Sequence, residues 1–324
     1  MNTVTQPGDI WNIDGHRVLC GDSTTKSIDR LMQGKTVPLL FTSPPYDNQR
    51  EYKQGSFNWT EMMIGMCKNI PFQDDTQVLI NLGLFYRKKE WVMYWDEWMK
   101  WMGEHWKRAG WYVWDQGWGL PGDWSGRFAP SHEFVFHFNY NERRPNKIVK
   151  SITGGQMVKA GRIDTIRNKK GKADSVYTHA GQPIQDFKIP DSVVRINRQA
   201  SVGIEVEHPA IFPIPFAEFM IKSFSNEGDI VYEPFAGSGT TLMAAELNKR
   251  KCYCVEIAPE YVDIIIRRFY RMFPNSAAIL EGTEYNFQEV AQDRGVELPN
   301  DDELYRTGTG SKRKEAISTL MEYL

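Results

Sequence analysis

The sequence predicts an α/β fold with a doubly wound, mostly parallel sheet. Three short apolar runs, at 37–41, 77–82 and 133–138, are typical of buried strands. Between the last two runs, tryptophans and a methionine recur at helical spacing over 91–102, which predicts a helix. Strands that alternate with helices favour a parallel sheet. Ligands usually bind at the carboxyl ends of such strands, so the chemistry is expected in the loops that follow them.

The same alternation is expected in the second half of the chain. Its predicted elements are, in order, a helix at 215–224, a strand at 229–233, a turn at 234–239, a helix at 240–248, a strand at 252–256 and a helix at 259–273. The last of these helices begins after a proline and carries an apolar stripe at helical spacing. We therefore expect a second group of parallel strands there.

The middle of the chain lacks this pattern and is basic. Residues 141–200 contain 13 Lys and Arg against 5 Asp and Glu, a surplus of +8 in a chain whose net charge is −2. We interpret 141–204 as an inserted region. It separates an N-terminal part at 1–140 from a C-terminal part at 205–275, and 276–324 forms a C-terminal extension.

Composition narrows the class of protein. The chain of 324 residues is 41% hydrophobic and 25% charged, which is typical of a globular protein. Its four cysteines are scattered, and its histidines lack the spacing of metal ligands, so we expect neither a disulfide framework nor a metal site. No signal sequence and no apolar run of membrane-spanning length is recognisable, which predicts a cytoplasmic protein without a membrane partner.

A glycine-rich loop at 235–241 lies between a predicted strand and a predicted helix. Glycines permit a tight turn and bring backbone N–H groups and a helix N-terminus close to a ligand, which favours an anionic or carboxylate-bearing cofactor. The loop lacks the Lys of a phosphate-binding P-loop. Glu256 ends the next strand, 17 residues after Gly239, where a carboxylate can accept hydrogen bonds from ribose hydroxyls. The alternative is an ordinary strand–turn–helix unit with an exposed glutamate.

A second loop, Ser43-Pro44-Pro45-Tyr46, follows the strand at 37–41. The prolines lack N–H groups, so the loop presents acceptors. The Ser43 hydroxyl oxygen and the Pro44 carbonyl could accept the hydrogens of a base's exocyclic amine, which restores electron density on its nitrogen. Tyr46 offers a ring on which a flipped base can stack. For the tetrapeptide alone, a surface loop or a proline-rich ligand is the alternative, and its position after a buried strand argues against both.

These motifs resemble those of the DNA amino-methyltransferases. Residues 43–46 look like the catalytic motif of that family, and 233–241 look like its cofactor motif, with Glu233 where Asp is usual. Residues 208–210 and 21–23 resemble two further motifs. The catalytic motif comes first and a basic stretch separates the two, which is similar to the permuted beta-class order. The resemblance implies a Rossmann-like S-adenosylmethionine-dependent methyltransferase fold. It makes 1–140 the catalytic half, 141–204 the target-recognition region and 205–275 the cofactor-binding half.

The resemblance implies a role for each matching position. Catalysis is assigned to Ser43, Pro44, Pro45 and Tyr46. Cofactor binding is assigned to Asp22, Thr42, His208, Pro234, Phe235, Gly237, Ser238, Gly239, Thr240, Thr241 and Glu256. Because the leaving group is a neutral thioether, no metal is required.

The basic residues of the inserted segment are interpreted as contacts to DNA phosphates. They are Arg143, Arg144, Lys147, Lys150, Arg162, Arg167, Lys169, Lys170 and Lys172. A solvated loop without a partner is the alternative. The expected substrate is duplex DNA with a flipped target base.

Ser43 makes cytosine N4 the preferred target, since adenine-N6 members usually carry Asp or Asn at this position; adenine N6 is the alternative. Transfer to RNA or to a protein glutamine is disfavoured, because relatives with those substrates usually place the cofactor loop before the catalytic loop.

A catalytically degenerate DNA-binding subunit is the non-enzymatic alternative, and the intact loops argue against it. The host would be a bacterial or phage-infected cell, and a homodimer and a cognate restriction enzyme are further partners to consider.

Overall fold

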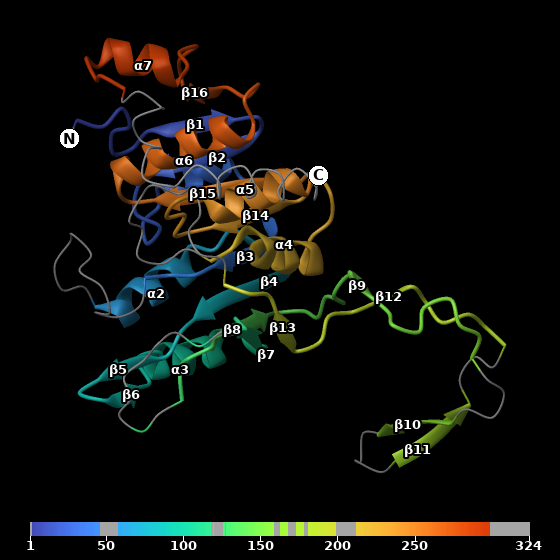
Figure 1. Ribbon diagram of the computed structural model, residues 1–324. Helices are drawn as coiled ribbons and strands as arrows, with labels where there is room; N and C mark the ends of the chain where they lie inside the picture. The colour runs from blue at the N-terminus through green and yellow to red at the C-terminus, as the bar shows by residue number, and fades with distance from the viewer. Residues whose placement is uncertain are drawn as a thin grey trace. The chain divides into compact units, whose positions relative to one another are not determined.

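The computed structural model describes residues 2–45, 58–117, 119, 126, 128–158, 163–167, 173–177, 181–198 and 212–298. The chain forms two compact units. The first contains residues 1–143 and 192–324, and the second is Arg144–Asp191, which lies within the predicted insertion at 141–204. Figure 1 shows the elements of both units.

The first unit is built on a ten-stranded sheet. In spatial order its strands are β13 (Val193–Arg195), β7 (Lys107–Asp115), β8 (His132–Asn139), β4 (Phe72–Leu82), β3 (Val37–Thr42), β14 (Ile230–Glu233), β15 (Lys251–Glu256), β2 (His16–Cys20), β1 (Ile10–Ile13) and β16 (Ala278–Leu280). The five strands from β4 to β2 are all parallel. Antiparallel β8 flanks them on one side and β1 on the other. The predicted α/β sheet is thereby confirmed, with antiparallel strands added around a parallel centre.

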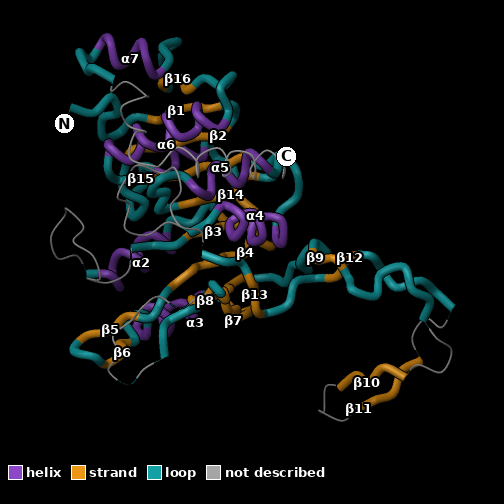
Figure 2. The backbone as a smooth tube through the Cα atoms, in the orientation of Figure 1, coloured by secondary structure: helices purple, strands orange, loops and turns teal. Residues whose placement is uncertain are grey.

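Helices cover both faces of this sheet (Figure 2). One face packs against α1 (Ile28–Met32), α2 (Trp59–Lys68) and α3 (Asp96–His105), and the other against α4 (Ile214–Phe224), α5 (Thr240–Leu247), α6 (Pro259–Met272) and α7 (Phe287–Asp293). Side chains of a strand alternate between the two cores, as a pleated strand requires. In β3, for example, Leu40 packs on the α1–α3 side, and Leu39 and Phe41 pack on the α4–α7 side.

The connections reverse direction between β3 and β14. From β3 the chain crosses through α2 to β4 on one side, and from β14 it crosses through α5 to β15 on the other. The register pairs Val231 with Leu39 and Tyr232 with Leu40, so the two strands end side by side. Such a switch point opens a crevice at the carboxyl ends of the strands. The loops after β3 and β14, almost two hundred residues apart in sequence, therefore meet as predicted.

Several elements differ from the sequence prediction. Trp91 lies in a hairpin of β5 (Phe85–Arg87) and β6 (Glu90–Val92), and the helix predicted from 91 begins only at Asp96. Trp91 pairs with Tyr86 across this hairpin, whose turn residues Lys88 and Lys89 adopt positive φ angles, so Trp91 lies in extended backbone and outside the helix. Residues 193–195, expected within the insertion, form an edge strand of the main sheet, and the expected extension after 276 supplies β16 and α7.

The second unit consists of two short antiparallel pairs. β9 (Val149–Lys150) pairs with β12 (Phe187–Lys188), and β10 (Ile163–Arg167) pairs with β11 (Ala173–Tyr177). No helix of the described part of the chain is long and apolar enough to cross a membrane.

Candidate active site

A single buried carboxylate joins the two loops. Glu233 is the last residue of β14 and is 2% exposed. The Thr42 hydroxyl, at the end of β3, and the Phe235 N–H, at 3.1 Å, donate to its Oε1. The Thr241 hydroxyl, in α5, donates to its Oε2 at 2.7 Å. Glu233 thus connects the start of the predicted catalytic loop to the predicted cofactor loop and to helix α5 behind it.

Burial raises the pKa values of two carboxyl groups at this site, those of Glu233 and Glu256. Desolvation raises the pKa of Glu233 to about 8, although the hydrogen bonds from Thr241, Thr42 and the Phe235 N–H act in the opposite direction. Desolvation also raises the pKa of Glu256, at the end of β15, to about 7, against hydrogen bonds from backbone N–H groups that include those of Ala258 and Gly237. The two carboxyl groups therefore titrate near neutral pH instead of near pH 4.5.

The glycine loop requires its two glycines. Gly237 has φ 53° and Gly239 has φ 83°, values that residues with a Cβ rarely adopt. A Cβ on Gly239 would also stand 3.1 Å from Cγ1 and Cγ2 of Ile265 in α6. The N–H groups of Phe235, Gly237 and Gly239 donate within the protein, so these three are not the ligand-facing donors that the sequence suggested. The loop is a close-packed turn.

Glu256 lies beside this turn. Its Oε2 accepts the Gly237 N–H at 2.8 Å and its Oε1 accepts the Ala258 N–H at 3.0 Å. The Ile257 N–H also donates to this carboxyl group. A carboxylate has about four acceptor positions, so three donors leave one position open. Asp22 follows the neighbouring strand β2, where the Gly21 N–H donates to the Glu256 carbonyl at 2.9 Å. Asp22 Oδ1 accepts from the N–H and the hydroxyl of Thr24, both at 2.8 Å.

Some predicted cofactor residues face the protein interior. Arg268 of α6 donates to the Ser238 carbonyl at 2.9 Å, to the Ser238 hydroxyl at 3.0 Å and to the Thr240 hydroxyl at 3.1 Å. Burial lowers the pKa of Arg268 to about 10. Pro234 is buried too, whereas Phe235 and Gly237 are partly exposed. Those two residues are the partly exposed part of the turn at 234–238.

The catalytic loop is held from the other side by a tryptophan. Pro44 is buried, while Ser43 and Pro45 are partly exposed. The Trp59 indole N–H, at the start of α2, donates to the Pro45 carbonyl at 2.7 Å. Asn58 caps this helix by accepting the Glu61 N–H. Sequence reasoning missed Trp59, because nothing local to position 59 indicates a bond to residue 45.

Two predicted site residues, Tyr46 and His208, lie outside the described residues. So do four of the predicted DNA contacts, Arg162, Lys169, Lys170 and Lys172, and for Arg167 only the backbone, in β10, is described. Their roles stay predictions.

Arg143 lies at the opposite edge of the sheet from the two loops. Its guanidinium is 3.6 Å from Asp75, in the first half of β4, and 3.6 Å from Asp229, just before β14. The side chain is 19% exposed. Two carboxylates at the amino ends of the strands therefore engage it, and this placement argues against Arg143 as a phosphate contact beside the catalytic loop.

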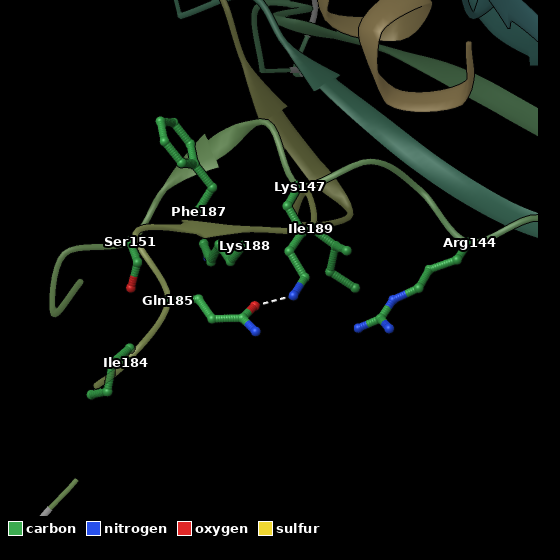
Figure 3. A pocket seen from close by; sticks show the side chains of 8 residues that line it. All are labelled: Arg144, Lys147, Ser151, Ile184, Gln185, Phe187, Lys188 and Ile189. Carbon is green, nitrogen blue, oxygen red and sulfur yellow. Dashed lines mark hydrogen bonds between the residues drawn. The ribbon is translucent and has the colours of Figure 1, made fainter. Parts of the chain in front are cut away.

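Other predicted DNA contacts gather in the second unit. Arg144, Lys147 and Lys188 line a pocket of about 340 Å³ (Figure 3). Lys147 donates to the amide oxygen of Gln185 across it. Lys150 is exposed in β9. Lys188 was not singled out from the sequence, although it belongs to the same basic segment.

No group of three or more His, Cys, Asp or Glu among the described residues is arranged to hold a metal ion.

Comparison with known proteins shows what the chain is related to. The family model described as DNA methylase, for N6 and N4 methyltransferases, matches residues 37–267. The orphan methyltransferase M.BamHII of Bacillus amyloliquefaciens is 30% identical over 250 residues, which cover 72% of this chain and 88% of that protein. The DNA adenine methyltransferase YhdJ of Escherichia coli (strain K12) is 39% identical over 88 residues, 27% of this chain and 30% of that protein.

A solved structure has the same fold. The PvuII DNA methyltransferase, described as cytosine-N4-specific, aligns with a TM-score of 0.55 at 20% identity, over 85% of this chain and 89% of that one. The family match includes both the loop after β3 and the loop after β14. The chain belongs to the DNA methylase family of N6 and N4 methyltransferases.

Proposed function

We propose that this protein is a site-specific DNA methyltransferase that transfers a methyl group from S-adenosylmethionine to the exocyclic amine of a flipped cytosine, at N4. The observation that carries the proposal is the meeting of the two loops through Glu233. Because Thr42 and Thr241 bind the same carboxylate, the acceptor groups after β3 and the glycine turn after β14 are held as one site.

The residues around the glycine turn suit this cofactor. S-adenosylmethionine supplies a methyl group activated by a sulfonium, on a nucleoside with two ribose hydroxyls. Glu256 accepts three backbone N–H groups and keeps one acceptor position for such a hydroxyl. Phe235 and Gly237 offer the exposed surface of the turn, and Asp22 follows the next strand. These four residues would bind the cofactor, while Ser238, Thr240 and Thr241 support the turn from within.

The catalytic loop would hold the target amine. An exocyclic amine is a weak nucleophile because its lone pair is delocalised into the ring. Ser43 Oγ and the Pro44 carbonyl would accept its hydrogens and restore density on nitrogen. The Pro45 carbonyl already accepts the Trp59 N–H, which fixes the direction of the loop. Tyr46 would stack on the flipped base.

The preference for cytosine rests on Ser43 rather than on the relatives. Among these, YhdJ is described as a DNA adenine methyltransferase, and the PvuII enzyme as cytosine-N4-specific. Adenine N6 is therefore the second candidate target. A degenerate DNA-binding subunit is disfavoured, because the Glu233 connection and the glycine turn are both intact.

Duplex DNA is the proposed partner. Arg144, Lys147 and Lys150 of the second unit would contact phosphates, together with the predicted residues outside the described range. A homodimer and a cognate restriction enzyme are further proposed partners, and sizing of the full chain with and without DNA tests the first of them.

A transfer assay tests the proposal. The full chain is incubated with methyl-labelled S-adenosylmethionine and, in parallel, with DNA, RNA or protein. We expect label in DNA, loss of that label in Ser43→Ala, and wild-type cofactor affinity in the same variant. Label confined to RNA or protein would overturn the proposal, as would full activity in Ser43→Ala.

A further inference from the structure

The β5–β6 hairpin presents aromatic and basic side chains to solvent. Tyr86 and Trp91 form a cross-strand pair, and Trp91 is 57% exposed. Met93, just after the hairpin, is 47% exposed. Lys88 and Lys89 form the tip, and both side chains are exposed. Exposed apolar side chains that lie together, as this aromatic pair does, can mark a contact surface.

The other face of the hairpin is anchored in the core. Phe85 and Val92 form the neighbouring cross-strand pair and pack against the α1–α3 core. Arg87 lies 5.7 Å from the centre of the Phe85 ring, on this face. Burial of one face explains why the hairpin stays folded. It does not explain why the opposite face carries Trp91.

The hairpin is tied to the catalytic loop through Trp59. Trp59 donates to the Pro45 carbonyl at 2.7 Å and packs edge-on against Tyr94, with ring centres 4.9 Å apart. The Tyr94 hydroxyl donates to the Gly83 carbonyl at 3.0 Å, at the base of the hairpin, and the Tyr94 ring lies 6.4 Å from that of Phe85. The hairpin leaves the carboxyl end of β4, and β3, which carries the catalytic loop, is the adjacent parallel strand (Figure 1).

The positive charge of the hairpin tip indicates a negatively charged partner. Residues 87–90 read Arg-Lys-Lys-Glu, so the tip carries a local charge of +2 in a chain with a net charge of −2. Lysines at a loop tip with exposed rings behind them suit a polyanion that also offers apolar surface, which describes a nucleic acid.

We propose that the β5–β6 hairpin is a second DNA-binding element, separate from the basic insertion, which contacts the duplex beside the target base. Lys88 and Lys89 bind phosphates, and Trp91 packs with Tyr86 against sugars and bases on the flank of the flipped nucleotide. The inference rests on the proposed function, because the hairpin reaches substrate only if the loop at Ser43 receives a base from DNA.

Binding measurements with the full chain test this element. We compare wild type with the double variant Lys88→Gln/Lys89→Gln and with Trp91→Ala, using a labelled random-sequence DNA duplex over a range of salt concentrations. The double variant should weaken binding about tenfold and reduce the salt slope by about 1.8, the value for two lost phosphate contacts. Trp91→Ala should weaken binding about fivefold or more, with the salt slope unchanged and binding recovered in Trp91→Phe.

Matched controls lie on other parts of the first unit. Lys249 is an exposed lysine with φ 57° at the amino edge of the sheet, and Tyr285 is 51% exposed beside β16. Lys249→Gln and Tyr285→Ala should bind DNA as wild type does. Thermal unfolding of every variant shows whether the fold is retained.

Wild-type affinity and salt slope in both hairpin variants would overturn the inference. The inference would also be overturned if the hairpin variants bind the duplex as wild type does but lose binding to single-stranded RNA or lose self-association. The surface would then be assigned to RNA or to a second copy of the chain.

Methyl transfer to DNA is measured in parallel. If wild type methylates no DNA, the proposed function fails; if it does and the hairpin variants keep the wild-type KM for DNA, only the hairpin inference fails.

Discussion

At the scale of single residues, Glu233 determines how the site is assembled. A buried carboxyl group is costly to leave without hydrogen bonds, and three donors surround this one. The last residue of β3 and the first turn of α5 are therefore held to the end of β14. The sequence showed Glu233 only as a departure from the usual Asp of the cofactor motif. Its partner Thr42 is remote in the chain, and the bond between them follows only from the strand order.

The raised pKa of Glu233 predicts a pH-dependent stability. Its value of about 8 in the folded protein lies above the unfolded value near 4.5. The stability that this group contributes is therefore fully present below about pH 4.5 and is lost as the pH rises through about 8. Glu233→Gln cannot ionise, so its free energy of unfolding should fall less than that of wild type over this range.

Denaturant unfolding at a series of pH values measures the difference. Glu227→Gln, which changes an exposed glutamate of the same unit, should retain the wild-type dependence. Equal slopes for wild type and Glu233→Gln would contradict the assignment.

At the scale of elements, two glycine substitutions distinguish the cost of backbone strain from the cost of a steric contact with α6. Gly239→Ala meets both an unfavourable φ of 83° and the Ile265 side chain at 3.1 Å. Gly228→Ala meets a φ of 86° with nothing within 4 Å. The second change should cost about 1 kcal/mol of unfolding free energy, from backbone strain alone. The first should cost roughly 2–4 kcal/mol and weaken cofactor binding.

Calorimetry gives both the unfolding free energy and the cofactor affinity of these variants. Equal costs at the two positions would show that contact with α6 does not constrain the turn.

The catalytic loop depends on α2 through one hydrogen bond. Trp59→Phe keeps a ring against Tyr94 and removes the donor to the Pro45 carbonyl. We expect kcat for methyl transfer to fall about fivefold or more, since the lost bond is worth about 1 kcal/mol, with cofactor affinity unchanged. Trp98→Phe removes another indole from the same cluster without touching the loop and should leave kcat near wild type. A wild-type kcat in Trp59→Phe would show that the hydrogen bond from α2 to the Pro45 carbonyl does not support methyl transfer.

The strands that could be predicted from the sequence are those that are buried on both faces. Strands β3, β14 and β15 are buried on both faces, so they read as continuous apolar runs. β7 is half exposed, begins with Lys-Arg and contains a glycine, and β13 has only three residues, so neither gives such a signal. Trp91 was assigned to a helix because its spacing from Trp95 and Trp98 fits a helical stripe by coincidence.

At the scale of the whole molecule, the order of the strands turns two separate motifs into one site. The change of direction between β3 and β14 places both loops at the same edge of the sheet, which the motif order and the α/β pattern together predicted. The residues that hold the loops there, Glu233, Trp59 and Arg268, could not be predicted, because each acts across the fold.

The central claim is that this joined site methylates an exocyclic amine in DNA. Its most direct test is mass spectrometry of nucleosides from DNA treated with the protein and S-adenosylmethionine. We predict N4-methylcytosine with wild type and none with Ser43→Ala, although that variant binds the cofactor. N6-methyladenine in its place would correct the target base and leave the site intact. DNA that carries neither modified nucleoside, treated with folded, cofactor-binding wild-type protein, would contradict the account.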